Sequence, residues 1–149
     1  MSYTKESVPE ETLKELLETY WTDFEKIPQP NIIIKNDSTD PFSRVDLHTG
    51  DYLVIKSESP EEVRYRGNIT YYDRIYQLTM EFRTMQDRQR IRDAWYVVKA
   101  IVFTNKHNFS GYQLIRIHSY QESVETELNI WRFIVRLQVE AHGVLAESI

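Results

Sequence analysis

The longest regular pattern in this chain is an alternation of apolar and polar residues across positions 128–141, LNIWRFIVRLQVEA. Alternation with a period of two is typical of a β-strand that buries one face and exposes the other. The predicted buried set comprises Trp131, Phe133, Val135, Leu137 and Val139. The usual strand has only about five or six residues. The pattern therefore predicts a sheet with one unusually long strand, and the contacts of that strand need an explanation.

Two arginines, Arg132 and Arg136, lie on the face of this strand that is predicted to point outward. In one interpretation the strand extends past its own sheet, so that its surplus length and charge meet a neighbouring subunit or another protein. In the alternative, a long hairpin packs on its own domain and both arginines are solvated. Exposed strand edges are usually paired or protected. We therefore treat Arg132 and Arg136 as candidate interface residues.

A first amphipathic helix is predicted near the start of the chain. Ser7 and Glu10 resemble a capping box at its beginning, and Pro28 and Pro30 end it because proline cannot continue a helix. Its apolar stripe, at helical spacing, consists of Leu13, Leu16, Leu17, Tyr20, Trp21 and Phe24.

A second helix is predicted to begin at residues 84–87, where Thr84 and Asp87 again suggest a capping box, and to end near Asn105. Its apolar stripe consists of Ile91, Ala94, Trp95, Val98, Ile101 and Val102. Trp95 on this helix and Trp131 on the last strand are expected to be buried between helix and sheet. If so, these two elements form the centre of the core.

The remaining segments complete the predicted order of helix, three strands, helix and two strands. The strands are expected at residues 32–35, 52–58, 73–84, 112–121 and 128–141, with a turn at 122–127 and a projecting loop or irregular hairpin at 60–73. This order predicts a two-layer α+β domain, in which both helices cover one face of a mostly antiparallel sheet of about five strands. The length suits a single domain over 1–149, with a core at about 8–141 and short tails.

Composition and spacing offer no catalytic, cofactor or metal site. The chain has no cysteine, its four histidines lack metal-ligand spacing, and its four glycines are too scattered for a phosphate-binding loop. A net charge of −5 argues against broad phosphate binding. The sequence contains no run of about 18 apolar residues, so no membrane span is predicted. We therefore expect a protein without enzymatic activity, cofactor or membrane contact.

The 60–73 segment interleaves tyrosine with arginine. Both residue types are enriched at the energetic centres of protein interfaces, and both also bind single-stranded nucleic acid by stacking. The overall acidity favours a protein partner. The candidate interface residues of this segment are Arg64, Tyr65, Arg66, Tyr71 and Tyr72.

The one basic cluster of the chain lies around the start of the second helix and comprises Arg83, Arg88, Arg90 and Arg92. Arg88 and Arg92 share a face at i and i+4. Asp87 and Asp93 dilute its charge. Ion pairs within the fold or to a neighbouring subunit are the favoured interpretation, and phosphate binding is the alternative.

Three stretches of the chain together resemble a known family. They are the opening helix with IPQPNIIIK, then TGDYLVIKSES with the following loop and DRIYQLTMEFRTMQDRQRIRDAWYVV, and finally the closing pair YQLIRIHSYQ and NIWRFIVRLQVEA. In this pattern of elements and spacing, over about residues 8–141, the chain resembles the tail terminator (tail completion) proteins of long-tailed phages and related tailed viruses.

The resemblance implies a structural role in a virion. Members of that family form a hexameric ring on the tail tube, stop its growth and present a surface to the neck or head connector. The implied partners are further copies of the chain, the tail tube protein and a neck or head-completion protein, with DNA only passing through the ring. The implied location is the tail or neck of a virion that assembles in the host cytoplasm. Alternatives are another neck, head-completion or tube component, or a nucleic-acid-binding α+β module, with a motif-free enzyme last.

Overall fold

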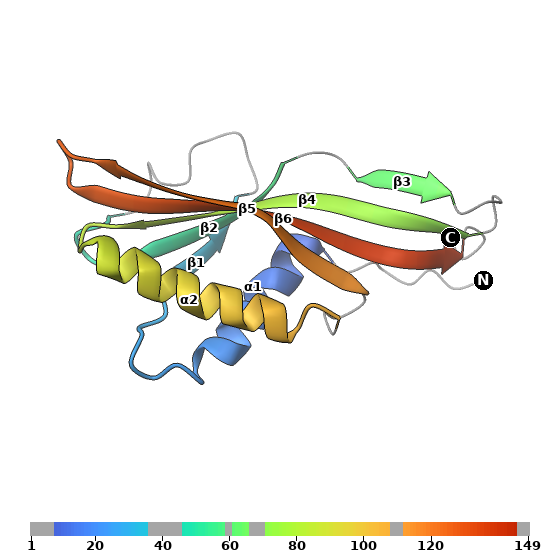
Figure 1. Ribbon diagram of the computed structural model, residues 1–149, viewed down its shortest axis with the longest axis horizontal. Helices are drawn as coiled ribbons and strands as arrows, with labels where there is room; N and C mark the ends of the chain where they lie inside the picture. Colours follow the sequence, from blue (N-terminus) through green and yellow to red (C-terminus); the bar gives the residue numbers. More distant parts are fainter. Residues whose placement is uncertain (1–7, 36–45, 59–60, 66–70, 108–111, 146–149) are drawn as a thin grey trace.

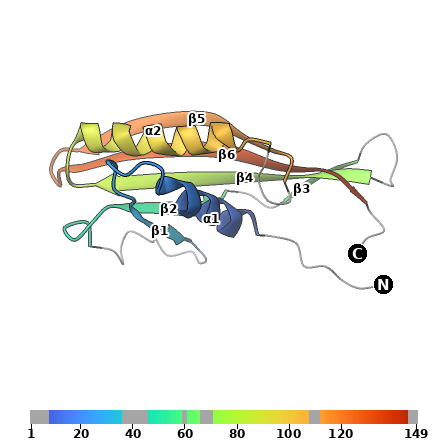
Figure 2. The same ribbon diagram turned by 90° about the horizontal axis from the view of Figure 1, so that it is seen from below.

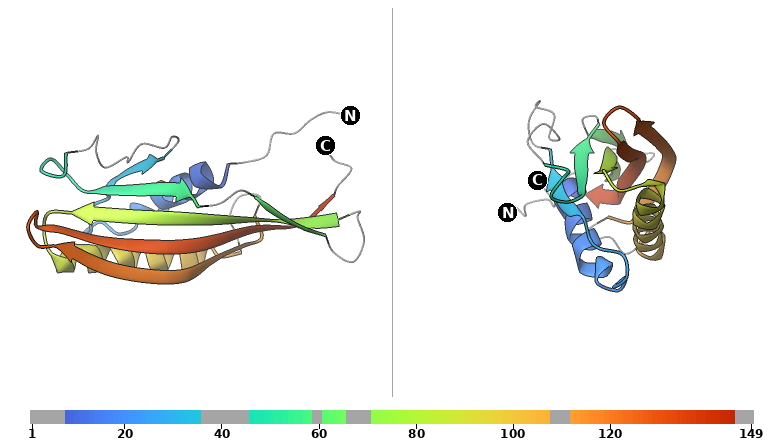
Figure 3. Two further views of the ribbon diagram at one scale, coloured as in Figure 1. Left: turned by 90° about the horizontal axis from the view of Figure 1, so that it is seen from above. Right: turned by 90° about the vertical axis from the view of Figure 1, so that its left-hand side faces the viewer.

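The computed structural model describes residues 8–35, 46–58, 61–65, 71–107 and 112–145, with side chains as far as His142. These residues form two helices and a six-stranded sheet (Figure 1). In chain order the elements are α1 (Pro9–Trp21), β1 (Asn31–Ile34), β2 (Tyr52–Ser57), β3 (Glu62–Tyr65), β4 (Tyr71–Thr84), α2 (Arg88–Thr104), β5 (Leu114–Glu125) and β6 (Ile130–Leu145). Seen end-on, helices and sheet form two layers (Figure 3). The predicted α+β class is confirmed.

The sheet is built around two long antiparallel strands, β4 and β6. The order is β1-β2-β4-β6-β5, and β3 pairs with β4 beyond the end of β2. Only β1 and β2 run parallel. β4 pairs with β6 from Thr84 opposite Trp131 to Tyr71 opposite Leu145. On its other side, β6 pairs with β5 from Ile130 to Glu140.

The length of β6 therefore has a cause within the fold. The expectation that β6 extends past its own sheet is wrong, because β6 is paired with β4 as far as Leu145 and, on its other side, with β5 as far as Glu140. A strand of this length requires long partners, and β4 with 14 residues and β5 with 12 supply them. The surplus length thus forms backbone hydrogen bonds inside the sheet.

The core lies between the helices and one face of the sheet. Alternate residues of β6, including Phe133, Val135, Leu137 and Val139, are fully buried there, as the alternation predicted. Phe133 stacks on Phe82 of β4 with ring centroids 5.1 Å apart. The helices contribute Leu13, Leu17, Trp21, Ile91, Ala94, Val97, Val98, Ile101 and Val102.

The two tryptophans predicted to be buried are only partly so. Trp95 and Trp131 pack against the edge of the core, and Trp95 stacks on Tyr120 with ring centroids 4.4 Å apart. The buried tryptophan is Trp21 at the end of α1, whose indole Nε1 donates to the carbonyl of Ile27 at 2.9 Å. That bond satisfies the one polar atom of a large side chain that is otherwise in an apolar environment.

Both predicted capping boxes need correction. α1 begins at Pro9 with Val8 as its N-cap, which makes no side-chain cap bond, and Ser7 lies outside the described residues. In α2 the cap is Asp87, whose carboxylate accepts from the backbone N–H of Arg90 at 2.9 Å. Thr84 cannot cap that helix because it is the last residue of β4.

Several strand boundaries also differ from the predictions. The predicted turn at 122–127 belongs largely to β5, which runs on to Glu125. β6 continues past Ala141 to Leu145. Part of the segment at 60–73, predicted as a loop or irregular hairpin, forms the sixth strand, β3, and its residues 66–70 lie outside the described part of the chain.

Candidate interaction surfaces

At one end of the sheet, β3 and the adjoining ends of β4 and β6 continue beyond both helices (Figures 1 and 2). We call β3 with residues 71–75 and 141–145 the arm. β3 runs antiparallel to β4, with Tyr65 opposite Tyr72, and Tyr71 of β4 is opposite Leu145 of β6. Four of the predicted interface residues are thereby brought together, namely Arg64, Tyr65, Tyr71 and Tyr72. The fifth, Arg66, lies outside the described residues.

The arm exposes apolar surface. Tyr65 is 63% exposed and Tyr71 47%, and Val63 is also exposed. Tyr72 is buried, and the centre of its ring lies 6.1 Å from that of Tyr65. Tyr72 therefore packs against the exposed Tyr65 rather than forming part of the exposed surface itself. Because aromatic residues at this exposure are costly to hydrate and are enriched at interfaces, the tip of the arm is a candidate contact surface.

Arg64 lies on the other face of β3 and is already paired. Its Nε donates to Glu62 Oε1 at 2.8 Å, and both side chains are exposed. The hydrogen bond to Glu62 is the main reason that the pKa of Arg64 is raised above its usual value. The local charge of the arm is thus balanced, so the tyrosines distinguish it as a surface.

The root of the arm contains an ion pair with a buried arginine, which the sequence analysis missed. Arg74 Nε lies 2.5 Å from Glu61 Oε1, and the guanidinium also donates to the Tyr76 hydroxyl. Arg74 is 8% exposed. A signal was present, because Arg74 occupies a core-facing position of β4 between Tyr72 and Tyr76, and a charge at such a position requires a partner.

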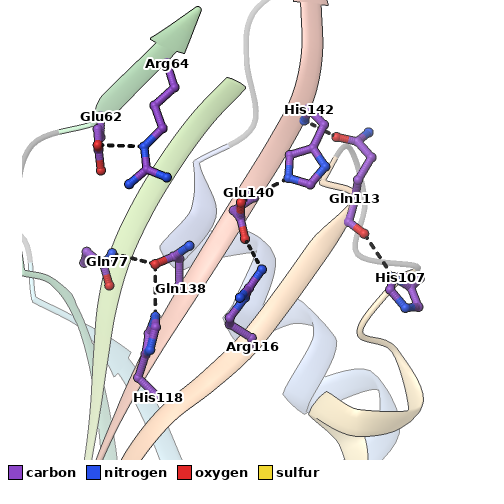
Figure 4. A network of polar contacts seen from close by, with 10 residues as sticks. All are labelled: Glu62, Arg64, Gln77, His107, Gln113, Arg116, His118, Gln138, Glu140 and His142. Carbon is purple, nitrogen blue, oxygen red and sulfur yellow. Dashed lines mark hydrogen bonds and ion pairs between the residues drawn. The ribbon is translucent and has the colours of Figure 1, made fainter. Parts of the chain in front are cut away.

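A polar network joins β5 and β6 where the arm begins (Figure 4). Glu140 Oε2 accepts from Arg116 at 3.0 Å, and Glu140 Oε1 lies 3.1 Å from His142 Nε2. Burial raises the pKa of the Glu140 carboxyl. Hydrogen bonds from His142 and Gln138 and the charge of Arg116 outweigh burial and hold the pKa below its usual value.

A second part of this network crosses three strands. Gln138 Oε1 on β6 accepts from Gln77 Nε2 on β4 at 2.9 Å and lies 3.0 Å from His118 Nε2 on β5 (Figure 4). The network therefore links neighbouring strands at the root of the arm and stabilises their register.

The arginines at the start of α2 make contacts within the fold. The guanidinium of Arg88 lies 5.5 Å from the centre of the Trp131 ring, and Arg92 Nε lies 3.9 Å from Glu122. Glu122 also accepts from the Tyr120 hydroxyl at 2.6 Å. Burial and then this hydrogen bond raise the pKa of Tyr120 above its usual value. Arg88 and Arg92 are on the helix layer, away from the arm.

Between these two arginines lies Arg90, which is buried. Its Nε lies 2.5 Å from Asp51 Oδ2, and its Nη2 donates to the carbonyl of Pro28 at 2.8 Å. Gln86 Nε2 donates to the same Asp51 oxygen at 3.1 Å. The pair ties the start of α2 to the start of β2 and to the segment after α1. It is a structural contact rather than a candidate site.

The two predicted interface arginines of β6 have different surroundings. Arg132 Nε donates to Ser123 Oγ at 2.5 Å, and its Nη1 lies 3.4 Å from Glu125 of β5. Arg136 is exposed, and in register it faces Thr79 of β4 and Ser119 of β5. Within the described residues the side chain of Arg136 has no hydrogen bond or ion pair. Arg132 is therefore used within the fold, whereas Arg136 is available to a partner.

The described part of the chain offers neither a metal site nor a membrane-spanning helix. No three residues of the types His, Asp and Glu come close enough there to hold a metal ion. Neither of the described helices is both long and apolar enough to cross a membrane.

Comparison with known proteins supports the fold. No protein-family model and no curated protein sequence matches the chain. A chain in a solved structure described as the virion of a native gene transfer agent (GTA) particle aligns with a TM-score of 0.54 and 11% identity, over 95% of this chain and 100% of that one. A second solved chain is 13% identical over 93% of this chain and 98% of that one, but its TM-score of 0.38 is too low to indicate a shared fold. The α+β arrangement described above thus also occurs in a virion particle.

Proposed function

We propose that this protein is a structural component of a virion, similar to the tail terminators of tailed viruses. In this proposal six copies form a ring that caps the tail tube, stops its growth and joins the tail to the neck or head. The observation that carries the proposal is the likeness of fold, over nearly the whole of both chains, to a chain of a gene transfer agent virion. The order and spacing of the elements, which resemble the tail terminator family, support it independently.

The geometry suits a subunit that assembles with others. The long sheet is a stiff platform, because β4 and β6 pair along their whole length and are packed by helices on one side. The arm extends beyond that platform and exposes Tyr65 and Tyr71. In the proposed ring, the arm contacts the tail tube or a neighbouring subunit, where these tyrosines are removed from water.

A different position in the same particle is the first alternative. The likeness of fold supports a neck, head-completion or tube component as well as a terminator. Adding the purified protein to growing tail tubes separates these possibilities. A terminator stops elongation and is found at one end, a tube component is incorporated along the length, and a neck or head-completion protein leaves elongation unchanged.

The contacts of the basic residues weigh against a nucleic-acid-binding module. Arg64 is paired with Glu62, Arg92 with Glu122, and Arg88 covers the ring of Trp131. A phosphate-binding face needs cations that are not already neutralised. Salt-sensitive binding of an oligonucleotide by the isolated monomer would favour this alternative over the proposal.

Substituting the arm surface should separate assembly from folding. In the variant Arg64→Thr with Tyr65→Thr, the stability should change by no more than about 0.5 kcal/mol, because both side chains are exposed and threonine favours strands. Ring formation or attachment to tail tubes should weaken by about tenfold or more, as expected for aromatic and arginine residues at an interface. Thermal melting and sedimentation measure the two effects.

The matched control is Phe103→Ala on α2, which removes a similarly exposed aromatic side chain from the helix layer, outside the arm. It should assemble normally. Normal assembly of the arm variant on tails, or its global unfolding, would show that the arm is not a contact surface.

A further inference from the structure

We call the side of the sheet that faces away from the helices the open face, and one arginine on it, Arg136, has no ion pair among the described residues. The other described arginines of this face have carboxylate partners: Arg83 with Glu81, Arg116 with Glu140 and Arg132 with Glu125. Arg136 lies near the middle of this face, between Thr79 and Ser119 in register. Glu58 accepts a hydrogen bond from Thr79, the residue opposite Arg136, and it already lies 3.8 Å from Lys56.

The opposite side of the molecule carries an acidic ridge on α1. Glu11, Glu15 and Glu18 are exposed and follow one another at i, i+4 and i+7, which places them on one stripe of the helix. Leu13 and Leu17, on the other side of the helix, are fully buried in the core. None of the three glutamates has an ion pair within the described residues. Lys14 is the one basic residue of α1 and flanks the ridge.

These two surfaces lie on opposite sides of a two-layer molecule (Figures 2 and 3). They cannot both belong to one two-fold interface, in which each copy presents the same patch. They can meet when copies associate head to tail, because each copy then offers its ridge to one neighbour and its open face to the other. Head-to-tail contacts close into rings when the rotation between copies allows it.

We propose that the open face around Arg136 binds the acidic ridge of α1 from a second copy of the chain. The guanidinium of Arg136 would hold a carboxylate of the ridge through paired hydrogen bonds. The exposed Ser119 and Gln121 beside it supply neutral polar groups for the remaining contacts. This inference rests on the proposed function, since it names the contact between neighbouring subunits of the proposed ring.

A charge exchange tests the contact directly. The first variant, Arg136→Glu, should repel the ridge, and the second, Glu15→Lys with Glu18→Lys, should repel the open face. Each variant alone should assemble about tenfold or more weakly than the wild type, because like charges face each other across the contact. An equimolar mixture should regain assembly, since each ridge then meets an open face of opposite charge and a ring of six can alternate the two variants.

The controls make the same charge changes elsewhere. Lys106→Glu after α2 and Glu127→Lys in the β5–β6 turn are exposed positions outside both surfaces, and both should assemble as the wild type does. Mass is measured by light scattering, with circular dichroism to verify the fold of each variant. Raised salt should weaken wild-type assembly, because exposed charges are screened.

The outcomes distinguish this contact from the proposed function. A wild-type ring together with normal assembly of both variants would overturn the contact and leave the ring intact. Two impaired variants whose mixture stays impaired would also overturn the pairing of ridge and open face. A wild type that remains monomeric and leaves the growth of tail tubes unchanged would contradict the contact and the proposed function together.

Discussion

Replacing Asp51 with alanine is expected to lower the free energy of unfolding by about 3–5 kcal/mol, because it leaves the buried charge of Arg90 without its partner. Arg90 is 6% exposed and Asp51 7%. The carboxylate lies 2.5 Å from Arg90 Nε and also accepts from Gln86. The retained bond to the carbonyl of Pro28 cannot neutralise the guanidinium. Urea denaturation of wild type and variant measures the difference.

The control for this substitution is Glu125→Ala, which removes the acid of the more exposed pair with Arg132. Its effect should stay within about 0–1 kcal/mol, since exposed ion pairs contribute little. Adding Arg90→Leu to Asp51→Ala should recover part of the lost stability, because the unpaired charge is then removed as well. If Asp51→Ala costs no more than Glu125→Ala, then the Arg90 pair is solvated and the description of it as buried is wrong.

Replacing Phe133 with alanine is expected to lower the free energy of unfolding by about 3–5 kcal/mol, as for large aromatic residues in cores. Phe133 is fully buried on β6. Its ring stacks on Phe82 and lies 5.7 Å from Tyr120 and 6.0 Å from Trp95. The substitution would therefore open a cavity where the sheet meets α2. Chemical denaturation followed by fluorescence measures the loss.

Phe103→Ala serves as the control for the core substitution as well, since Phe103 is 55% exposed on α2. Its effect should be within about 0.5 kcal/mol, as for most surface substitutions. Equal effects at Phe133 and Phe103 would mean that the buried face of β6 has been assigned to the wrong side. The loss predicted for Asp51→Ala or for Phe133→Ala is a large part of the roughly 5–15 kcal/mol by which such proteins are stable.

The fold class followed from periodicity, which identifies the buried face of an element well. The alternation around Phe133 and Val135 predicted side chains that are fully buried. Periodicity does not indicate how far the helices extend over the sheet. The prediction that Trp95 and Trp131 are fully buried was wrong for this reason, since both are only partly covered. β3 alternates polar and apolar residues, but it has only four residues and all four are exposed, so its pairing with β4 is what identifies it as a strand.

The candidate surfaces were less predictable, because they depend on register between strands far apart in the sequence. Arg132 and Arg136 are equivalent in the pattern of β6. Across the strand pair, however, Arg132 meets Ser123 and Glu125, whereas Arg136 faces Ser119 and Thr79. Asp51 and Arg90 likewise come together from separate elements. Residue type alone marked the arginines as candidate interface residues. Only the fold distinguishes an arginine that is paired within the domain from one that can contact a partner.

The mass and shape of the purified protein test the central proposal most directly. A homo-hexameric ring should have six times the 17.9 kDa mass of one chain and should appear as a closed ring by electron microscopy. Added to tail tubes of its own virion, it should occupy one end and stop their growth. A single species of 17.9 kDa that persists at high protein concentration and leaves tube growth unchanged would contradict the account.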